Sequence, residues 1–200
     1  GKRMLITADK ALTSNVTLNK VRVEIPNLDA YEPVLDITGN GTGELRNMLQ
    51  FVQTSPVSQI LNKVLDDAKA TGPSELRLKL SVPLAKVETT QVKGLLSLNN
   101  NSLQIVRGMP WVNALQGQIE FSNQGLQLKG VKGLSLGALV EVSGGTQKNG
   151  YLDIRANGVA TAAGLAEYLN PLVGSYLHGE TPFSVQVLTD ANKLELHVKS

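Results

Sequence analysis

Residues 75–82 read Glu-Leu-Arg-Leu-Lys-Leu-Ser-Val, a strict alternation of polar and apolar side chains. A period of two places one kind of side chain on each face of a β-strand. The same period recurs in residues 118–122 and 193–199. Shorter runs with this spacing are residues 16–18, 21–25, 126–128, 140–142 and 185–187. The pattern predicts antiparallel strands with one apolar face and one solvent-facing side.

Turn-forming residues separate these runs. The candidate turns are Asn99-Asn100-Asn101-Ser102, Ser122-Asn123-Gln124-Gly125, and Gly144-Gly145 followed by Lys148-Asn149-Gly150. Asn, Ser and Gly clusters of this kind interrupt periodic segments. We therefore expect hairpins at all three positions.

Two stretches change to the period of a helix. After Glu44, apolar residues follow at helical spacing, and the pattern resumes after Ser55 and Pro56 and ends at Gly72-Pro73. The second stretch begins near Thr161, is interrupted by Pro171 and ends before Gly179. The sequence thus predicts two short amphipathic helical segments, each interrupted by a proline.

Internal repeats link the two halves of the chain. Residues 35–41 recur as residues 152–158 with five of seven positions identical, and each copy precedes a helical stretch, a glycine and a new strand. A smaller, hairpin-sized echo relates residues 94–105 to residues 117–128. We interpret residues 1–200 as a single fragment of a repeat protein, with one unit at about 1–83 and another at about 84–200. Such units stack and share one apolar surface.

The composition excludes several classes of function. There are 19 basic and 17 acidic residues, a balance without the clustered positive charge that nucleic-acid binding needs. The chain has no cysteine, which excludes disulfides, thiolate nucleophiles and cysteine metal sites. His178 and His197 have no carboxylate at ligand spacing. We expect no catalytic site, no metal and no cofactor, so an enzyme is the last-ranked interpretation.

The hairpin pattern, the segment at residues 152–158 and two further stretches resemble a known family. Residues 111–121 read WVNALQGQIEF, and a broken helix ends in Leu-His-Gly-Glu-Thr-Pro-Phe at residues 177–183. These features resemble the AsmA-like proteins of Gram-negative bacteria, and within them the YhdP branch. The resemblance implies an inner-membrane anchor, a periplasmic location and a long antiparallel sheet curled into an open hydrophobic trough. It also implies a role in moving phospholipid from the inner to the outer membrane.

The expected function is that of a lipid-binding segment of such a bridge protein. Both ends of the chain look cut from something longer, so we expect the anchor to lie outside residues 1–200. Expected partners are phospholipid acyl chains, with envelope proteins as further candidates. The aliphatic composition, with three Phe and one Trp, suits an acyl-binding wall. The residues expected to line the trough are Leu78, Leu80, Leu96, Leu98, Ile105, Ile119, Phe121, Leu128, Val140, Val142 and Ile154.

Other interpretations remain open at the level of sequence. Alternating strands usually bury their apolar face against protein, so a closed sandwich is the ordinary alternative. In that case the chain would be a structural or adhesive β-repeat module that binds protein or glycan without lipid. The helical segments fit a plug, a gate, an edge cap or a plain core helix. Which strand face is the interior is also undecided, because a register slip exchanges the faces.

Overall fold

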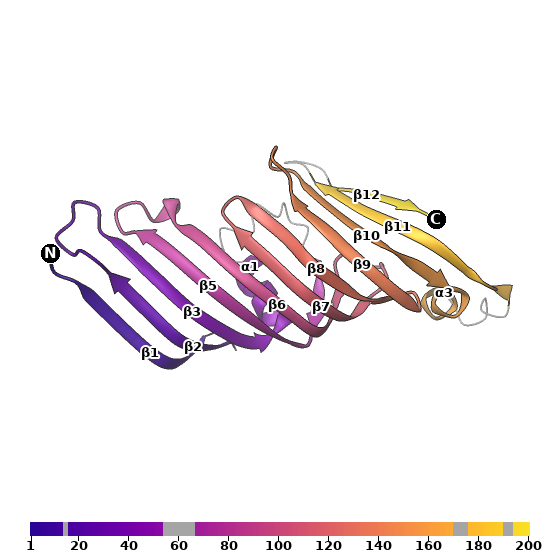
Figure 1. The fold of residues 1–200 in the computed structure, drawn as a ribbon, viewed down its shortest axis with the longest axis horizontal. Coiled ribbons are helices and arrows are strands. Elements are labelled where there is room, and N and C mark those ends of the chain that lie inside the picture. The colour runs from indigo at the N-terminus through magenta and orange to yellow at the C-terminus, as the bar shows by residue number, and fades with distance from the viewer. Residues whose placement is uncertain (14–15, 54–66, 170–175, 190–193) are drawn as a thin grey trace.

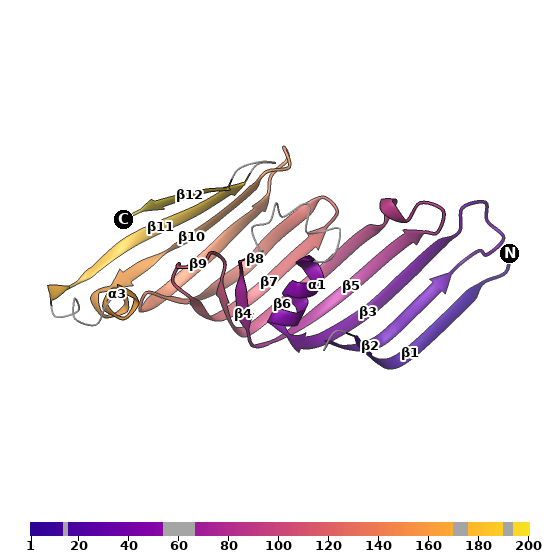
Figure 2. The ribbon, with the colours of Figure 1, turned by 180° about the vertical axis from the view of Figure 1, so that it is seen from behind.

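The computed structural model describes residues 1–13, 16–53, 67–169, 176–189 and 194–200. Within them the chain forms a 12-stranded antiparallel sheet and two α-helices. Every strand except β4 follows its predecessor in chain order across the sheet, and β4 pairs with β6 (Figures 1 and 2). The predicted mostly β architecture is therefore confirmed.

The elements have the following bounds. The strands are β1 (Met4–Thr13), β2 (Val16–Ile25), β3 (Val34–Glu44), β4 (Lys69–Thr71), β5 (Pro73–Pro83), β6 (Gln91–Gln104), β7 (Val112–Ser122), β8 (Gly125–Ser135), β9 (Ala138–Thr146), β10 (Leu152–Thr161), β11 (Glu180–Thr189) and β12 (Leu194–Lys199). The helices are α1 (Leu45–Gln53) and α3 (Ala162–Leu169), and a 3-10 turn spans Val87–Thr89.

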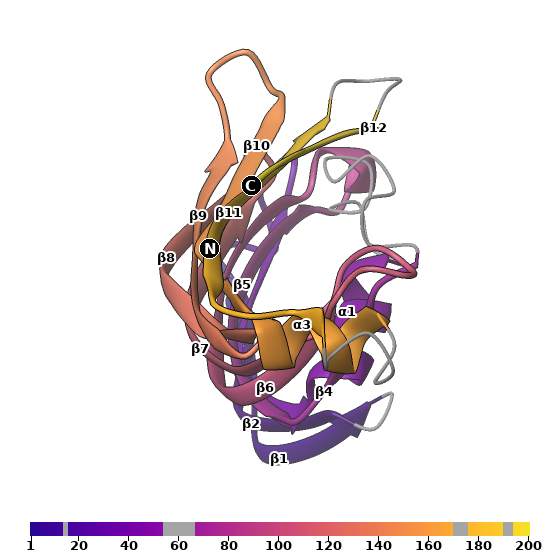
Figure 3. The same ribbon diagram turned by 90° about the vertical axis from the view of Figure 1, so that its right-hand side faces the viewer.

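The sheet is curled and stays open. Seen along its long axis it forms a trough, and both helices lie on its concave side (Figure 3). The edge strands β1 and β12 are at opposite ends of the strand order and do not pair with each other. The open, curled trough expected from the sequence is thus the observed fold.

Bulges help to curl the sheet. The register shifts between β2 and β3, β6 and β7, β7 and β8, and β8 and β9. A residue with positive φ lies in each shifted stretch: Lys20, Asn100, Ala114 and Gly130. A bulge bends its strand and increases the local twist. It also changes which alternate residues face inward: in β8, Leu128 and Val131 both point to the concave side.

One predicted turn is wrong, and another begins later than expected. Residues 99–102 lie inside β6, so residues 94–105 are not a hairpin like residues 117–128. Asn101 is fully buried there; its Nδ2 donates to the Pro73 carbonyl and to Ser74 Oγ, both at 3.0 Å. The asparagines therefore form a bulge held by a buried amide rather than a turn. Gly144 and Gly145 likewise belong to β9, and the turn comes only at residues 147–151.

The larger repeat has a structural counterpart. Residues 35–41 lie in β3, which leads into α1 and pairs with β5. Residues 152–158 lie in β10, which leads into α3 and pairs with β11. The second helical segments and their prolines, Pro56 and Pro171, lie outside the described residues. The boundary at about 83/84 stays a prediction, since β5 and β6 pair across it in one continuous sheet.

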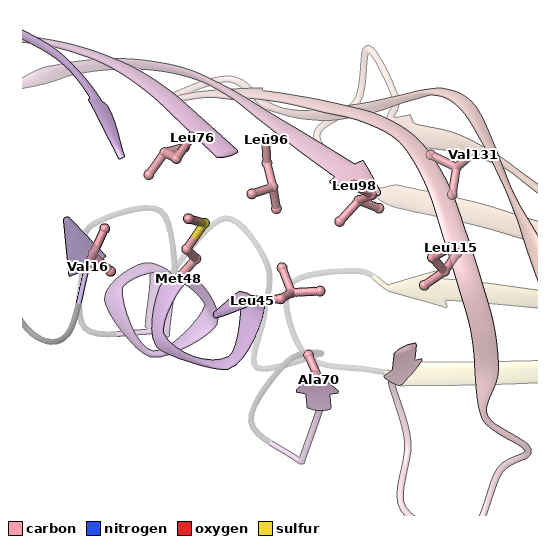
Figure 4. Close-up of a cluster of buried hydrophobic side chains, with 9 residues drawn as sticks. All are labelled: Val16, Leu45, Met48, Ala70, Leu76, Leu96, Leu98, Leu115 and Val131. Atoms are coloured by element: carbon pink, nitrogen blue, oxygen red, sulfur yellow. The ribbon is translucent and has the colours of Figure 1, made fainter. Parts of the chain in front are cut away.

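Helix α1 is fixed on the concave face from its first residue. The Leu45 amide donates to the Gly72 carbonyl at 2.8 Å, and the Gly72 amide donates to Glu44 Oε2 at 3.0 Å. Leu45 and Met48 are each 2% exposed and point toward the strands (Figure 4). The amphipathic face predicted for this segment is therefore packed against the sheet.

Candidate functional site: the concave apolar face

The concave face carries a continuous band of aliphatic side chains. On the first strands, each residue of the band is the direct cross-strand partner of the next. The residues, in strand order, are Ile6, Val23, Ile37, Leu80 and Val92. Direct partners on a sheet project from the same face. The band therefore crosses β1, β2, β3, β5 and β6 without interruption.

Packing continues the band to the other edge. Val92 is packed by Leu78, Leu80, Phe121 and Leu126, and Leu126 also packs against the cluster of Leu152 and Val187. We call this band the apolar row. Its members are Ile6, Val23, Ile37, Leu78, Leu80, Val92, Phe121, Leu126, Leu152, Ile154, Val187 and Leu196. Most are only half-buried, and Ile6 and Leu196 at the two edges are 54% and 43% exposed.

A second part of the same face is covered. Leu45 and Met48 of α1 and Ala70 of β4 pack on strand residues that are themselves buried (Figure 4). We call this part the covered half. Its strand residues are Val16, Leu76, Leu96, Leu98, Leu115 and Val131. The helix thus closes one half of the concave face and leaves the apolar row beside it more accessible.

The structure brings ten of the eleven predicted lining residues onto this one face. Leu78, Leu80, Phe121 and Ile154 belong to the apolar row. Leu96 and Leu98 are buried in the covered half, and Ile119, Leu128 and Val142 pack against its rim. Val140 is buried on the same side of β9 as Val142, two residues away.

The eleventh residue, Ile105, follows the end of β6 and is not on a strand. It nevertheless packs against the Leu152 and Val187 cluster, so the segment after β6 reaches the inner wall formed by β10 and β11. Whether any of the eleven residues contacts lipid stays a prediction.

Sequence reasoning missed eight members of the apolar row, namely Ile6, Val23, Ile37, Val92, Leu126, Leu152, Val187 and Leu196. The alternation at residues 21–25, 126–128 and 185–187 marked these strands as amphipathic. The alternation did not indicate which residues of neighbouring strands face each other, because the bulges in β2 and β8 set the register between the strands. One signal was available in β2: its apolar residues change from even-numbered positions, Val16 and Leu18, to odd-numbered positions, Val23 and Ile25.

The outer face is polar and carries the charges. In β5, Glu75, Arg77 and Lys79 are exposed between inward-facing leucines. In β2, the Glu24 carboxylate accepts from Arg22, with 2.7 Å between Nη2 and Oε2, and also pairs with Arg3. These two guanidinium groups, Arg22 first, lower the pKa of Glu24 below its usual value. In these two strands the charged side chains therefore project from the outer face.

The described residues show no group of three or more His, Asp or Glu side chains able to hold a metal ion. His197 Nε2 lies 3.4 Å from Glu195 Oε2 on the exposed edge strand β12. Among the side chains that the structure describes, the buried polar ones are Ser74, Asn101, Ser135 and Thr189, none of which is ionisable near neutral pH.

The family assignment rests on the entire chain. The model of one protein family, described as YhdP protein, matches residues 1–200. The chain belongs to the YhdP family. The resemblance drawn from residues 111–121 and 177–183 is thereby confirmed. Comparison with curated proteins and with solved structures gave no match. In the described part of this YhdP-family chain, no helix has both the length and the apolar character that a membrane crossing requires.

Proposed function

We propose that this chain binds phospholipid acyl chains along the apolar row and forms one segment of a periplasmic groove that conducts phospholipid between the inner and outer membranes. The observation that carries the proposal is the row itself: an aliphatic band, largely half-exposed, that runs from one edge strand of an open sheet to the other. Membership in the YhdP family, whose resemblance to AsmA-like proteins implies this transport, supports it.

The chemistry of the row suits a flexible hydrocarbon. Each methylene that leaves water for an apolar wall gains about 0.8 kcal/mol, so a tail that covers only part of the row is held. The row members are Leu, Ile and Val with one Phe, and none has a polar group that would fix a tail in one place. Many weak and similar contacts allow a tail to slide from strand to strand.

The position of α1 confines the proposed acyl path. In the covered half, Leu45 and Met48 already occupy the space above Leu76, Leu96 and Leu98. A tail that follows the trough past α1 therefore runs along Leu80, Phe121 and Leu126. The headgroup would remain in water at the open side of the curled sheet, since β1 and β12 do not pair to close it.

The test is native mass spectrometry of the purified chain, followed by solvent extraction and analysis of lipids. We expect copurified phospholipid with the wild-type chain and its loss in Leu80→Asp, because a carboxylate in the path opposes hydrocarbon contact. Ile119→Asp places a carboxylate beside the path, at the rim of the covered half, and should also reduce the bound lipid. Gln118→Asp is the matched control: Gln118 is exposed, and its neighbour Ile119 faces the trough. It places the same charge one residue away, on the outer face.

A chain that folds, remains monomeric and takes up no phospholipid, even when lipid is added, would contradict the proposal. That outcome would favour a structural β-repeat module that binds protein or glycan. Equal lipid loss in Gln118→Asp and Ile119→Asp would also count against the proposal, because it would separate lipid binding from the concave face.

A further inference from the structure

A second feature lies on the face opposite the apolar row. A groove of about 850 Å³ crosses β3, β5, β6, β7 and β8. Its lining contains three consecutive residues from each of the first four of these strands, for example Arg77, Leu78 and Lys79. Leu78 faces the trough, so its two neighbours project from the outer face. The inward-facing residues thus give the floor of the groove, and the outward-facing rows on either side of them form its walls.

One wall is a row of four side chains with an unusual pairing. Thr38 is the cross-strand partner of Lys79, Lys79 is the partner of Lys93, and Lys93 is the partner of Ser122. All four line the groove. Like charges directly opposite each other destabilise a sheet. Two ammonium groups between two hydroxyl groups therefore form a site that lacks its counter-charge.

Neighbouring carboxylates are engaged elsewhere. Glu120 lines the groove, but its Oε1 lies 2.7 Å from Lys129 Nζ. Asp36, one step along β3 from Thr38 on the same face, accepts from Ser81 Oγ at 2.5 Å. Within the described residues, no ion pair joins Lys79, Lys93 or Arg77 to a carboxylate. The Arg77 guanidinium, in the opposite wall, adds a third uncompensated cation to the groove.

We propose that this groove binds a phosphate group between Lys79 and Lys93, with Arg77 as a further donor. A phosphate has several acceptor oxygens and carries one negative charge as a diester and about two as a monoester, which matches a pair of ammonium groups and a guanidinium. The site goes beyond the proposed acyl path, because its side chains stand on the other face of the same strands. Free phosphate esters and lipid-borne phosphates share this chemistry.

The first test is calorimetric titration of the chain with inorganic phosphate and with glycerol phosphate at low salt. We expect saturable binding that weakens about tenfold in Lys79→Gln and again in Lys93→Gln, the effect of losing one charge-assisted hydrogen bond each. Lys132→Gln is the matched control, since Lys132 is exposed on the same face, opposite Glu141 and outside the groove. It removes an equal charge and should leave binding unchanged.

A thermal melt provides a readout independent of affinity. Without added anion, Lys79→Gln should melt at the wild-type temperature or above it, because the change relieves repulsion from Lys93. Phosphate should raise the melting temperature of the wild type and of Lys132→Gln but not that of the Lys79→Gln, Lys93→Gln double variant. A double variant stabilised by phosphate as much as the wild type would overturn the site.

Flotation with vesicles distinguishes the two sources of phosphate. Binding to vesicles of phosphatidylglycerol and phosphatidylcholine that is lost in the double variant would assign the site to a lipid headgroup. Binding of glycerol phosphate without vesicle binding would assign it to a free phosphate ester. If no probe binds the wild type more tightly than the double variant, the proposal fails, whatever the lipid content of the trough. Conversely, Ile119→Asp should lose lipid from the trough and still bind phosphate as the wild type does.

Discussion

Two leucines on the concave face should respond very differently to the same substitution. Leu80 belongs to the apolar row and is half-buried, whereas Leu96 lies in the covered half and is 8% exposed. Both lie in the β5–β6 ladder, where Leu80 pairs with Val92 and Leu96 pairs with Leu76. Replacing each leucine with Asp tests whether the row borders an open groove or a closed core.

The magnitudes follow from burial. Burying a whole Leu side chain is worth about 1.5–3 kcal/mol, so half-buried Leu80 forfeits about 1 kcal/mol. The lower strand propensity of Asp adds up to about 1 kcal/mol, and the carboxylate can turn toward water in the trough. Leu96→Asp loses nearly the full burial and leaves an unpaired charge beneath α1, which adds about 3–5 kcal/mol. We expect a cost of about 2 kcal/mol at Leu80 and more than about 5 kcal/mol at Leu96, comparable to the entire stability of many domains.

The assay is urea unfolding of each purified variant, with the free energy taken from midpoint and slope. Gln118→Asp should cost no more than about 1 kcal/mol, because on the exposed face only the lower strand propensity of Asp remains. Losses above about 5 kcal/mol at both Leu80 and Leu96 would contradict this expectation, since they would mean that both positions lie in one sealed core. A Leu96→Asp chain that folds as well as Leu80→Asp would refute the cover formed by α1.

Three further substitutions test the architecture around the row. Met48→Ala should lower the free energy of unfolding by about 2–5 kcal/mol, because it leaves a cavity beneath α1; an unchanged thermal melt would contradict the docking of this helix. Asn101→Ala should cost about 2–4 kcal/mol in urea unfolding by removing the buried amide that bonds Ser74, and a loss below about 1 kcal/mol would show that water replaces it. Gly94→Ala should cost about 1–3 kcal/mol, since the new Cβ would overlap the Phe121 ring. Phe121→Leu in the same chain should restore part of that loss, and a purely additive double variant would count against this clash.

Much of the fold could be predicted because its signals are local. The alternation at residues 75–82 depends only on which side of the pleat each residue occupies, and β5 shows the expected exposed and buried positions. The apolar spacing after Glu44 is a property of one helix, and α1 begins at Leu45 as expected. The recurrence of residues 35–41 likewise predicted two strand–helix–strand units, and the structure shows that β3 pairs with β5 as β10 pairs with β11.

The errors have a common cause. Asn99–Ser102 and Gly144-Gly145 have the composition of turns, yet both lie within strands. At Asn101 the amide is enclosed by β4 and β5 and satisfies backbone groups there, so a residue typical of turns becomes part of the core. Turn propensity is a local preference, and contacts between distant segments override it. Such contacts leave no mark on the local pattern.

Residue type and spacing along the chain were enough to predict most strands, the aliphatic character of one face and the family. Which alternate residues meet across the sheet followed only from the folded chain. Bulges near Lys20, Asn100, Ala114 and Gly130 shift the register, so that in β2 and β8 the concave face takes both even-numbered and odd-numbered residues. The structure also decided that α1 covers one half of the concave face, and that Lys79 stands opposite Lys93. These relations depend on pairing between strands, which period and composition along a single chain do not specify.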